Sequence, residues 1–398
     1  MPRYLTAGES HGRGIIGLVE SFPAGIPISL KKINEQLGRR QQGYGRGGRM
    51  KIEKDKVNIL SGLRHGKTLG SPITLEISNK DWSNWKKIMD PMRSIGRNLS
   101  PMQKKRAYDV TAPRPGHIDL AGAIKYNQHD LRNVLERASA RETAARVACG
   151  AIARQLLEYF DINIASHVIS IGKAKISGKK IDFDLISGWS DASPVRCVDT
   201  VAEKKMIAVI KQAMKNRDTL GGVFEVRVCG LPTGLGNNAQ WYQKIDSQLA
   251  ATIMSIQSVK GVEIGKGFSN AGRFGSKVHD IIYYDSPDKH PKSKGFYRKT
   301  NRAGGIEGGL TNGSELIVRG ACKPISTLMR PLDTVDIICK EAREAIVERS
   351  DICVVPAAAI VGEAMVAMVL ADAFLDKFGG DNLAEIETNY ESYLNTDF

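Results

Sequence analysis

One apolar segment, residues 354–375, constrains the fold more than any other part of the sequence. Pro356, Glu363 and Asp372 interrupt it too often for a membrane span. We therefore expect a helix over residues 357–378 that is buried inside the protein and is preceded by a strand or turn. The chain has 398 residues, which is enough to bury a large core as one large domain or two ordinary ones.

The composition is that of a globular protein with a strong positive charge. Hydrophobic residues make up 42% and charged residues 25% of the chain, and the formal net charge is +14 at pH 7. The positive residues are spread over the chain, with dense patches at 31–56, 80–106 and 289–302. This charge favours an anionic partner: nucleic acid, an anionic lipid or a phosphorylated small molecule.

The cysteines and the first residues indicate the cellular compartment of the protein. The six cysteines form no CxxC pair, and none has metal-ligand spacing with a histidine. The sequence therefore predicts no metal site, and reduced thiols in a cytoplasmic protein. The first residues, MPRY, contain no apolar region of the kind found in a secretory signal.

Local patterns predict the remaining secondary structure. We expect helices at 29–39, 139–160, 200–217 and 239–259, and strands at 56–60, 73–77, 223–228 and 315–322. Capping boxes, Ser139-x-x-Glu142 and Thr200-x-x-Glu203, should begin two of the helices. The strand at 223–228 alternates as a half-exposed strand does. Residues 39–50, 80–116 and 284–305 are expected to form mobile loops.

Arginine and glycine are concentrated in residues 39–49, RRQQGYGRGGR. Guanidinium groups match phosphate and carboxylate oxygens, and glycine lets the backbone approach a ligand closely. We therefore expect a loop that binds a small polyanion. A nucleic-acid-binding loop is the alternative, but Tyr44 is the single aromatic residue here that a base could stack on.

Two histidines lie in turns that contain glycine, at 8–12 (GESHG) and 114–117 (RPGH). Histidine titrates near neutral pH, so His11 and His117 are candidate general acids or bases. A surface histidine that caps a turn explains His11 equally well, and it explains His117 better. The start of the helix at Ser139, next to Arg137, is a candidate phosphate site.

The combination of these motifs resembles the chorismate synthase family. The resemblance rests on segments that occur in the family's order and span nearly the whole chain: 8–12, 39–50, 114–117, 137–143, 304–309, 323–327 and 349–365. In one of them the family often reads Arg-His-Asp-Pro. This chain has Arg-Ser-Asp-Ile at 349–352, which keeps the arginine and the aspartate.

The resemblance implies an α+β fold, a large single-domain β-α-β sandwich over residues 1–398, and assembly as a homotetramer. It implies a lyase of the shikimate pathway that converts 5-enolpyruvylshikimate 3-phosphate into chorismate and phosphate. This anti-1,4-elimination requires reduced FMN without net redox change, and NADPH is the reductant in members that reduce their own flavin. The implied protein is cytoplasmic, with a small-molecule partner and no nucleic-acid or membrane partner.

The family's site residues carry over to this chain position by position. His11 is implied to protonate the departing phosphate, His117 to protonate the reduced flavin, and Asp351 to help remove the ring proton. The implied substrate-binding residues are Ser10, Arg40, Arg46, Arg49, Arg114 and Arg141, of which Arg40 and Arg46 are also assigned to NADP. The implied FMN-binding residues are Arg137, Ala138, Ser139, Gln257, Ser258, Gly308, Lys323, Pro324, Ile325, Ser326, Thr327 and Arg349.

Two other functions remain open on the residues alone. A basic nucleic-acid-binding protein would bind heparin or DNA with a steep salt dependence and would carry no flavin. A flavin-dependent oxidoreductase would oxidise one flavin for each product formed.

Overall fold

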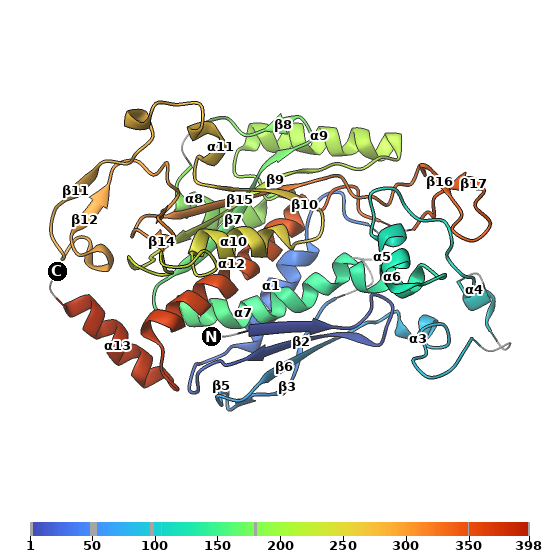
Figure 1. Ribbon diagram of the computed structural model, residues 1–398, viewed down its shortest axis with the longest axis horizontal. Coiled ribbons are helices and arrows are strands. Elements are labelled where there is room, and N and C mark those ends of the chain that lie inside the picture. Colours follow the sequence, from blue (N-terminus) through green and yellow to red (C-terminus); the bar gives the residue numbers. More distant parts are fainter. Residues whose placement is uncertain are drawn as a thin grey trace.

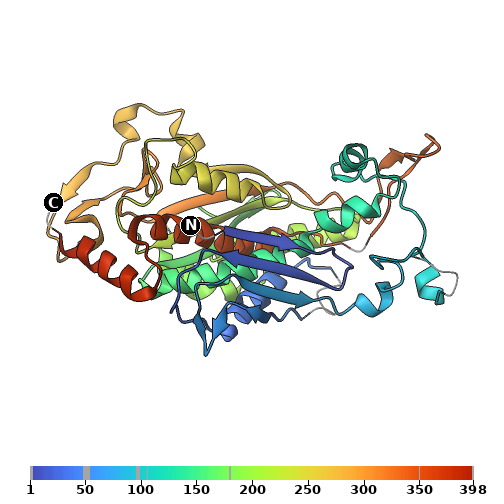
Figure 2. The same cartoon turned by 60° about the horizontal axis from the view of Figure 1, so that its bottom comes forward.

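The computed structural model describes residues 3–47, 54–95, 99–104, 106–178, 181–348 and 350–396. A middle layer of helices lies between two antiparallel sheets (Figure 1). The turned view in Figure 2 shows the same layers from another side. This arrangement confirms the expected β-α-β sandwich of an α+β protein.

The first sheet has the strand order β1-β2-β6-β3 in the described part of the chain. Its strands are β1 (Arg3–Ala7), β2 (Gly14–Glu20), β6 (Ile73–Ser78) and β3 (Asn58–Ser61). Alternate residues of β2 and β6 are buried against the helices, as expected for a sheet with one covered face. In β2, Gly17 allows close contact with the middle layer, because a Cβ there would lie 2.7 Å from Cys149 Sγ.

The second sheet has the strand order β10-β15-β9-β7-β8 in the described residues. Its strands are β10 (Val259–Ile264), β15 (Leu316–Cys322), β9 (Gly222–Cys229), β7 (Asn163–Ile171) and β8 (Ala174–Lys175). The expectation that residues 223–228 form a half-exposed strand is wrong, because Phe224, Glu225 and Val226 are all buried. β9 lies between β15 and β7 in the sheet, and Glu225 is neutralised there by Arg227 and Arg319.

The middle layer consists of α1 (Leu30–Gln41), α7 (Thr143–Tyr159), α10 (Ile245–Met254) and α12 (Val355–Phe378). α12 is the helix expected from the apolar segment, and it packs against α7, β7 and β9. It is long and apolar enough to cross a membrane, but 89% of its most apolar stretch of 18 residues is buried inside the structure. Gly150 of α7 permits close packing, because a Cβ there would lie 2.5 Å from Ala364 Cβ.

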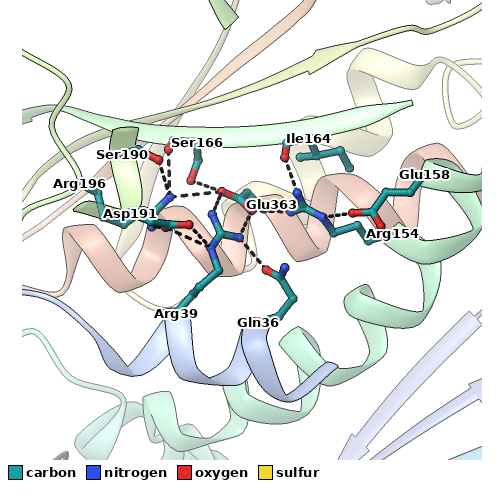
Figure 3. A network of polar contacts seen from close by, with 10 residues as sticks. All are labelled: Gln36, Arg39, Arg154, Glu158, Ile164, Ser166, Ser190, Asp191, Arg196 and Glu363. Atoms are coloured by element: carbon teal, nitrogen blue, oxygen red, sulfur yellow. Dashed lines mark hydrogen bonds and ion pairs between the residues drawn. The ribbon is translucent and has the colours of Figure 1, made fainter. Parts of the chain in front are cut away.

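A buried ion cluster joins the helices of the middle layer (Figure 3). Glu363 of α12 is 2% exposed and accepts hydrogen bonds of 2.6 Å from Arg39 of α1 and Arg154 of α7. Ser166 Oγ donates to it at 2.6 Å, and Arg196 lies at 3.5 Å. Burial by itself raises the pKa of Glu363, but these arginines outweigh it and lower the pKa to about 2. The cluster therefore fixes the carboxyl end of α1, where Arg40 follows Arg39.

The other helices lie around these layers. Within the described residues they are α3 (Trp82–Trp85), α4 (Pro101–Lys104), α5 (Asp119–Tyr126), α6 (Arg132–Ala138), α8 (Phe183–Trp189), α9 (Thr200–Asn216), α11 (Gly267–Asn270) and α13 (Leu383–Asn395). The 3-10 turns are η1 (Ala140–Glu142), η2 (Ser190–Ala192), η3 (Gly275–Lys277) and η4 (Pro291–Ser293). The short hairpins are β4 (Leu63–Arg64) with β5 (Lys67–Thr68), β11 (Ile282–Tyr284) with β12 (Phe296–Arg298), β13 (Ile306–Glu307) with β14 (Leu310–Thr311), and β16 (Asp333–Val335) with β17 (Ala342–Glu344).

Several local expectations need correction. The helix expected at 239–259 is shorter, because α10 covers Ile245–Met254 and residues from Val259 on belong to strand β10. The capping residue of α9 is Asp199 rather than Thr200, since its side chain accepts from the backbone N–H of Val201 and Ala202. The segments 80–116 and 284–305 contain short elements, α3 and α4 in the first and η4 and β12 in the second, and the expectation that they are mobile stays a prediction.

Candidate active site

A cavity of about 860 Å³ brings together segments that are far apart in the sequence. Its volume lies within the range of about 300–1,000 Å³ that is typical of small-molecule sites. The predicted site residues that line it are Ser10, His11, Arg40, Arg46, Arg114, His117, Ala138, Ser139, Arg141, Gln257, Ser258, Lys323, Ile325, Ser326, Thr327 and Asp351. They come from the loop after β1, the end of α1 and the loop after it, the turn before α5, the junction of α6 and η1, the segments that follow α10 and β15, and the segment before α12.

His11 is held at the edge of the cavity by a carboxylate and an aromatic ring. Its Nδ1 lies 2.8 Å from Glu136 Oε1, and its backbone N–H donates to Glu136 Oε2 at 2.8 Å. Its ring stacks on Trp85 with centroids 4.0 Å apart and planes inclined by 24°. Burial alone raises the pKa of Glu136, but the contacts with His11 and Arg132 outweigh it and lower that pKa below its usual value. Glu136 is therefore an ionised acceptor.

His117 has a carboxylate partner of its own. Asp119, at the start of α5, contacts His117 Nδ1 through Oδ1 and also holds Arg114 by a bond of 2.8 Å from Nε to Oδ2. Burial raises the pKa of Asp119, but His117 and Arg114 outweigh it and hold that pKa well below its usual value. Lys323 and Ser326 both donate to the carbonyl oxygen of Gly116, which joins the turn before His117 to the segment after β15.

Two predicted substrate arginines share one buried carboxylate. Asp55 accepts from Arg40 Nη2 at 2.6 Å and from Arg141 Nη1 at 2.5 Å. Burial lowers the pKa of Arg40, and repulsion by the charges of Arg46 and Arg141 lowers it further, to about 10. Asp55 compensates only part of this effect. One carboxylate between two guanidinium groups leaves an excess of positive charge beside the cavity, which suits an anionic ligand.

Asp351 connects the loop after α1 to the segment before α12. Its Oδ2 lies 2.9 Å from Arg46 Nη1, and its Oδ1 accepts from the backbone N–H of Gly47 at 2.6 Å. Gly47 packs closely here, since a Cβ on it would lie 2.8 Å from the carbonyl oxygen of Ser350. A predicted catalytic residue and a predicted substrate residue thus lie in direct contact.

The cavity is lined by more basic than acidic side chains. Besides the predicted arginines it includes Arg106, Arg132 and Lys260, against the carboxylates of Asp81, Glu348 and Asp351. Several polar atoms on lining residues, among them Gln257 Oε1 and Arg141 Nη2, are buried and have no hydrogen-bond partner within the described residues. Unpaired buried polar atoms are costly, so a polar ligand would stabilise them.

Some predicted residues are not part of this cavity. Arg137 points elsewhere and donates to the backbone oxygen and the hydroxyl of Thr6. Pro324 and Gly308 are not among the lining residues, and Gly308 lies in the turn between β13 and β14. Arg49 and Arg349 lie outside the described residues. For these five positions the proposed ligand contacts stay predictions.

Sequence reasoning missed the groups that hold the site together: Asp55, Trp85, Asp119 and Glu136. Asp119 is the one with a detectable signal, because it lies two positions after His117 at the start of a helix. Glu136 lies 125 positions from His11, and Asp55 lies 86 positions from Arg141. No local pattern joins residues at such distances.

Comparisons with known proteins agree with this geometry. The family model described as chorismate synthase matches residues 2–375. The chorismate synthase of Solibacter usitatus is 53% identical over 395 residues, covering 99% of this chain and 98% of that protein. That of Desulforamulus reducens is 54% identical over 394 residues, with 99% and 98% covered.

A solved structure described as "Crystal Structure of Chorismate Synthase" has the same fold. It superposes with a TM-score of 0.77 at 40% sequence identity, covering 99% of this chain and 97% of that one. These matches give no support to a nucleic-acid-binding protein or to an oxidoreductase. A match over nearly the full length, in sequence and in fold, shows that the chain belongs to the chorismate synthase family.

Proposed function

We propose that the protein converts 5-enolpyruvylshikimate 3-phosphate into chorismate and phosphate, as a lyase of the shikimate pathway. Membership of the family supports this activity. The observation that carries it is one cavity lined by two histidines, each paired with a carboxylate, and by a group of arginines. The proposed substrate bears a phosphate and two carboxylates, so it can occupy several arginines at once.

The arginines would bind the substrate and stabilise the leaving phosphate. Arg40 and Arg141 share the single charge of Asp55, so part of their positive charge is available to an anion in the cavity. A preorganised cationic pocket favours the transition state, because negative charge develops on the departing phosphate. Arg114 is already bound by Asp119 and Thr327. Because Asp119 also contacts His117, one carboxylate positions both this arginine and the histidine.

The elimination removes one proton from the substrate ring, and the departing phosphate accepts another. His11 would donate a proton to the departing phosphate, and Asp351 would accept the proton that leaves the substrate ring. Asp351 is held by Arg46 and by the backbone N–H of Gly47, which fixes the direction of its oxygens. His117, whose Nδ1 contacts Asp119, would donate a proton to the reduced cofactor when it is bound.

The residues present fit a flavin phosphate cofactor. Gln257 Oε1 is a buried acceptor without a partner in the described residues, and Ser139 lies at the start of η1, where backbone N–H groups favour phosphate. We propose that Ser139, Gln257, Ser258 and residues 323–327 would hold reduced FMN. When bound, the cofactor would supply electron density that helps the carbon–oxygen bond to phosphate break. NADPH, through Arg40 and Arg46, would be the reductant.

The proposal includes a cytoplasmic homotetramer. Large aromatic side chains lie exposed in α11 and shortly after it, with Phe268 at 79% and Phe274 at 86% exposure, and Trp241 before α10 is 75% exposed. Exposed apolar groups of this size favour burial against another copy of the chain. Sedimentation velocity measures the assembly, and a monomer would reject this part of the proposal.

The activity is tested by an anaerobic assay of the pure protein with reduced FMN and 5-enolpyruvylshikimate 3-phosphate. We expect chorismate absorbance and free phosphate to appear together, over many turnovers for each flavin. One oxidised flavin for each product would indicate an oxidoreductase instead. A protein that forms no chorismate, and that binds DNA with a steep salt dependence, would reject the proposal.

A further inference from the structure

Two residues around His11 have no part in the proposed chemistry, yet both are positioned by the fold to control that histidine. Glu136 lies on α6 and is 2% exposed. Trp85 ends α3, within the basic segment 80–106, and is 6% exposed. Trp85 lines the cavity together with His11. Both Trp85 and Glu136 contact the His11 ring directly.

Glu136 accepts more than one hydrogen bond from the loop at 8–12. Its Oε2 accepts the backbone N–H of His11 at 2.8 Å, and its Oε1 contacts His11 Nδ1 at 2.8 Å. Its backbone oxygen accepts the N–H of Ser10 at 3.0 Å. An ionised carboxylate only accepts hydrogen bonds. His11 Nδ1 must therefore carry the hydrogen in this contact, which leaves Nε2 as the nitrogen that exchanges a proton.

Trp85 fixes the plane of the imidazole ring. The stacked geometry, with centroids 4.0 Å apart, is a favourable contact of aromatic rings. The indole is itself held, because its Nε1–H donates to Asp81 Oδ2 at 3.0 Å. Arg106 and Arg132 lie over the Trp85 ring at 4.7 and 5.2 Å from its centroid. Among the described residues, the charged groups near His11 and its stacked indole include Glu136 and Arg132 of α6, Asp81 before α3, and Arg106.

We propose that Glu136 and Trp85 are positioning residues that hold His11 in one ring orientation with the permanent hydrogen on Nδ1, so that the imidazolium form donates its proton from Nε2 and the hydrogen on Nδ1 stays. The inference rests on the proposed function in the role it gives to His11. It also assigns a role to the segment 80–106, which the family resemblance left without one.

The structure makes Glu136→Gln a sharp test. The backbone N–H of His11 is a permanent donor, so the amide oxygen of the glutamine must face it. The amide NH₂ group then faces Nδ1 and needs an acceptor there. The replacement keeps the size of the side chain but favours the opposite tautomer, with the hydrogen on Nε2.

The tautomer is read by solid-state ¹⁵N NMR of protein labelled at histidine, at about pH 8.5, well above the ordinary histidine pKa of about 6.5. The His11→Phe variant identifies the His11 signals. We expect the hydrogen on Nδ1 in the wild type and on Nε2 in Glu136→Gln. A variant that keeps the hydrogen on Nδ1 would overturn the inference, whatever its activity.

Kinetics give the second measurement. We expect Glu136→Gln to lower kcat by roughly 10²-fold or more, as removal of a general acid does, with little change in KM. Glu136→Asp keeps two acceptor oxygens and should recover part of kcat. Trp85→Phe keeps a stacked ring and should be more active than Trp85→Leu. Equal kcat values for Glu136→Gln and the wild type would overturn the inference.

Glu225→Gln is the matched control. Glu225 is another buried glutamate that contacts a histidine, His167, at 3.1 Å, and it does not line the cavity. This variant should melt at a lower temperature but keep kcat within about twofold. If the wild type forms no chorismate, the proposed function fails while the tautomer measurement still decides this inference.

Discussion

Replacing Glu363 with glutamine tests whether the buried ion cluster holds the middle layer together. The change keeps the size of the side chain and removes one charge from a group that contacts Arg39, Arg154 and Arg196 (Figure 3). Breaking a buried ion pair by removing one partner costs about 3–5 kcal/mol, because the remaining charges stay buried without compensation.

The lowered pKa of Glu363 leads to a similar value for the stability that the ion cluster contributes. The arginines lower it from 4.5 to about 2 against the effect of burial, which corresponds to about 3 kcal/mol of stability. Because the folded pKa is below the unfolded one, this stability is fully present above about pH 4.5. It is lost as the pH falls through about 2. The difference between the wild type and Glu363→Gln should therefore shrink over that interval.

Calorimetry measures the effect as a melting temperature. Unfolding entropy of about 2.1 cal/mol/K per residue gives about 0.8 kcal/mol/K for this chain, so we expect Glu363→Gln to melt about 4–6 °C lower near neutral pH. The control is Glu158→Gln, which removes a partner of Arg154 and Lys32 that is 25% exposed. A partly exposed pair contributes less than about 1 kcal/mol. Equal melting temperatures for the two variants would refute the reasoning.

Three further predictions concern the cavity. Arg46→Ala should cost roughly 2–4 kcal/mol of transition-state stabilisation in kcat/KM, and Arg46→Lys should recover only part of it, since lysine has no bidentate fork; full activity of Arg46→Ala would exclude the loop from the substrate site. His11→Ala and His117→Ala should each lower kcat by roughly 10²–10⁴-fold. Only His117→Ala should change the spectrum of bound reduced FMN across pH, and identical spectra for both variants and the wild type would reject this division of roles. Oxidised FMN should bind more tightly with substrate present, because one anion orders the basic loops for the other ligand; equal affinities in fluorescence titrations would contradict this coupling.

Local sequence patterns predicted the elements whose packing agrees with their own periodicity. The apolar segment became α12, and residues 29–39 and 315–322 became α1 and β15 with shifts of one or two residues. The sequence patterns failed where packing against neighbouring strands and helices decides which side chains are buried. In β9, alternation indicated exposure for residues that flanking strands and α12 cover, and α10 ends where the chain turns into β10.

The sequence by itself determined the charged, glycine-rich and histidine-containing segments of the site, because a motif of adjacent residues identifies the family that uses it. Only the tertiary structure decided which carboxylates neutralise and orient them. Glu136 meets His11 across 125 positions, and Glu363 meets Arg39 across 324. Such pairs form because helices and sheets bury both partners at one place, and a buried charge is stable only beside its counter-charge. The spacing of residues along the chain does not show which charged side chains meet in the folded protein.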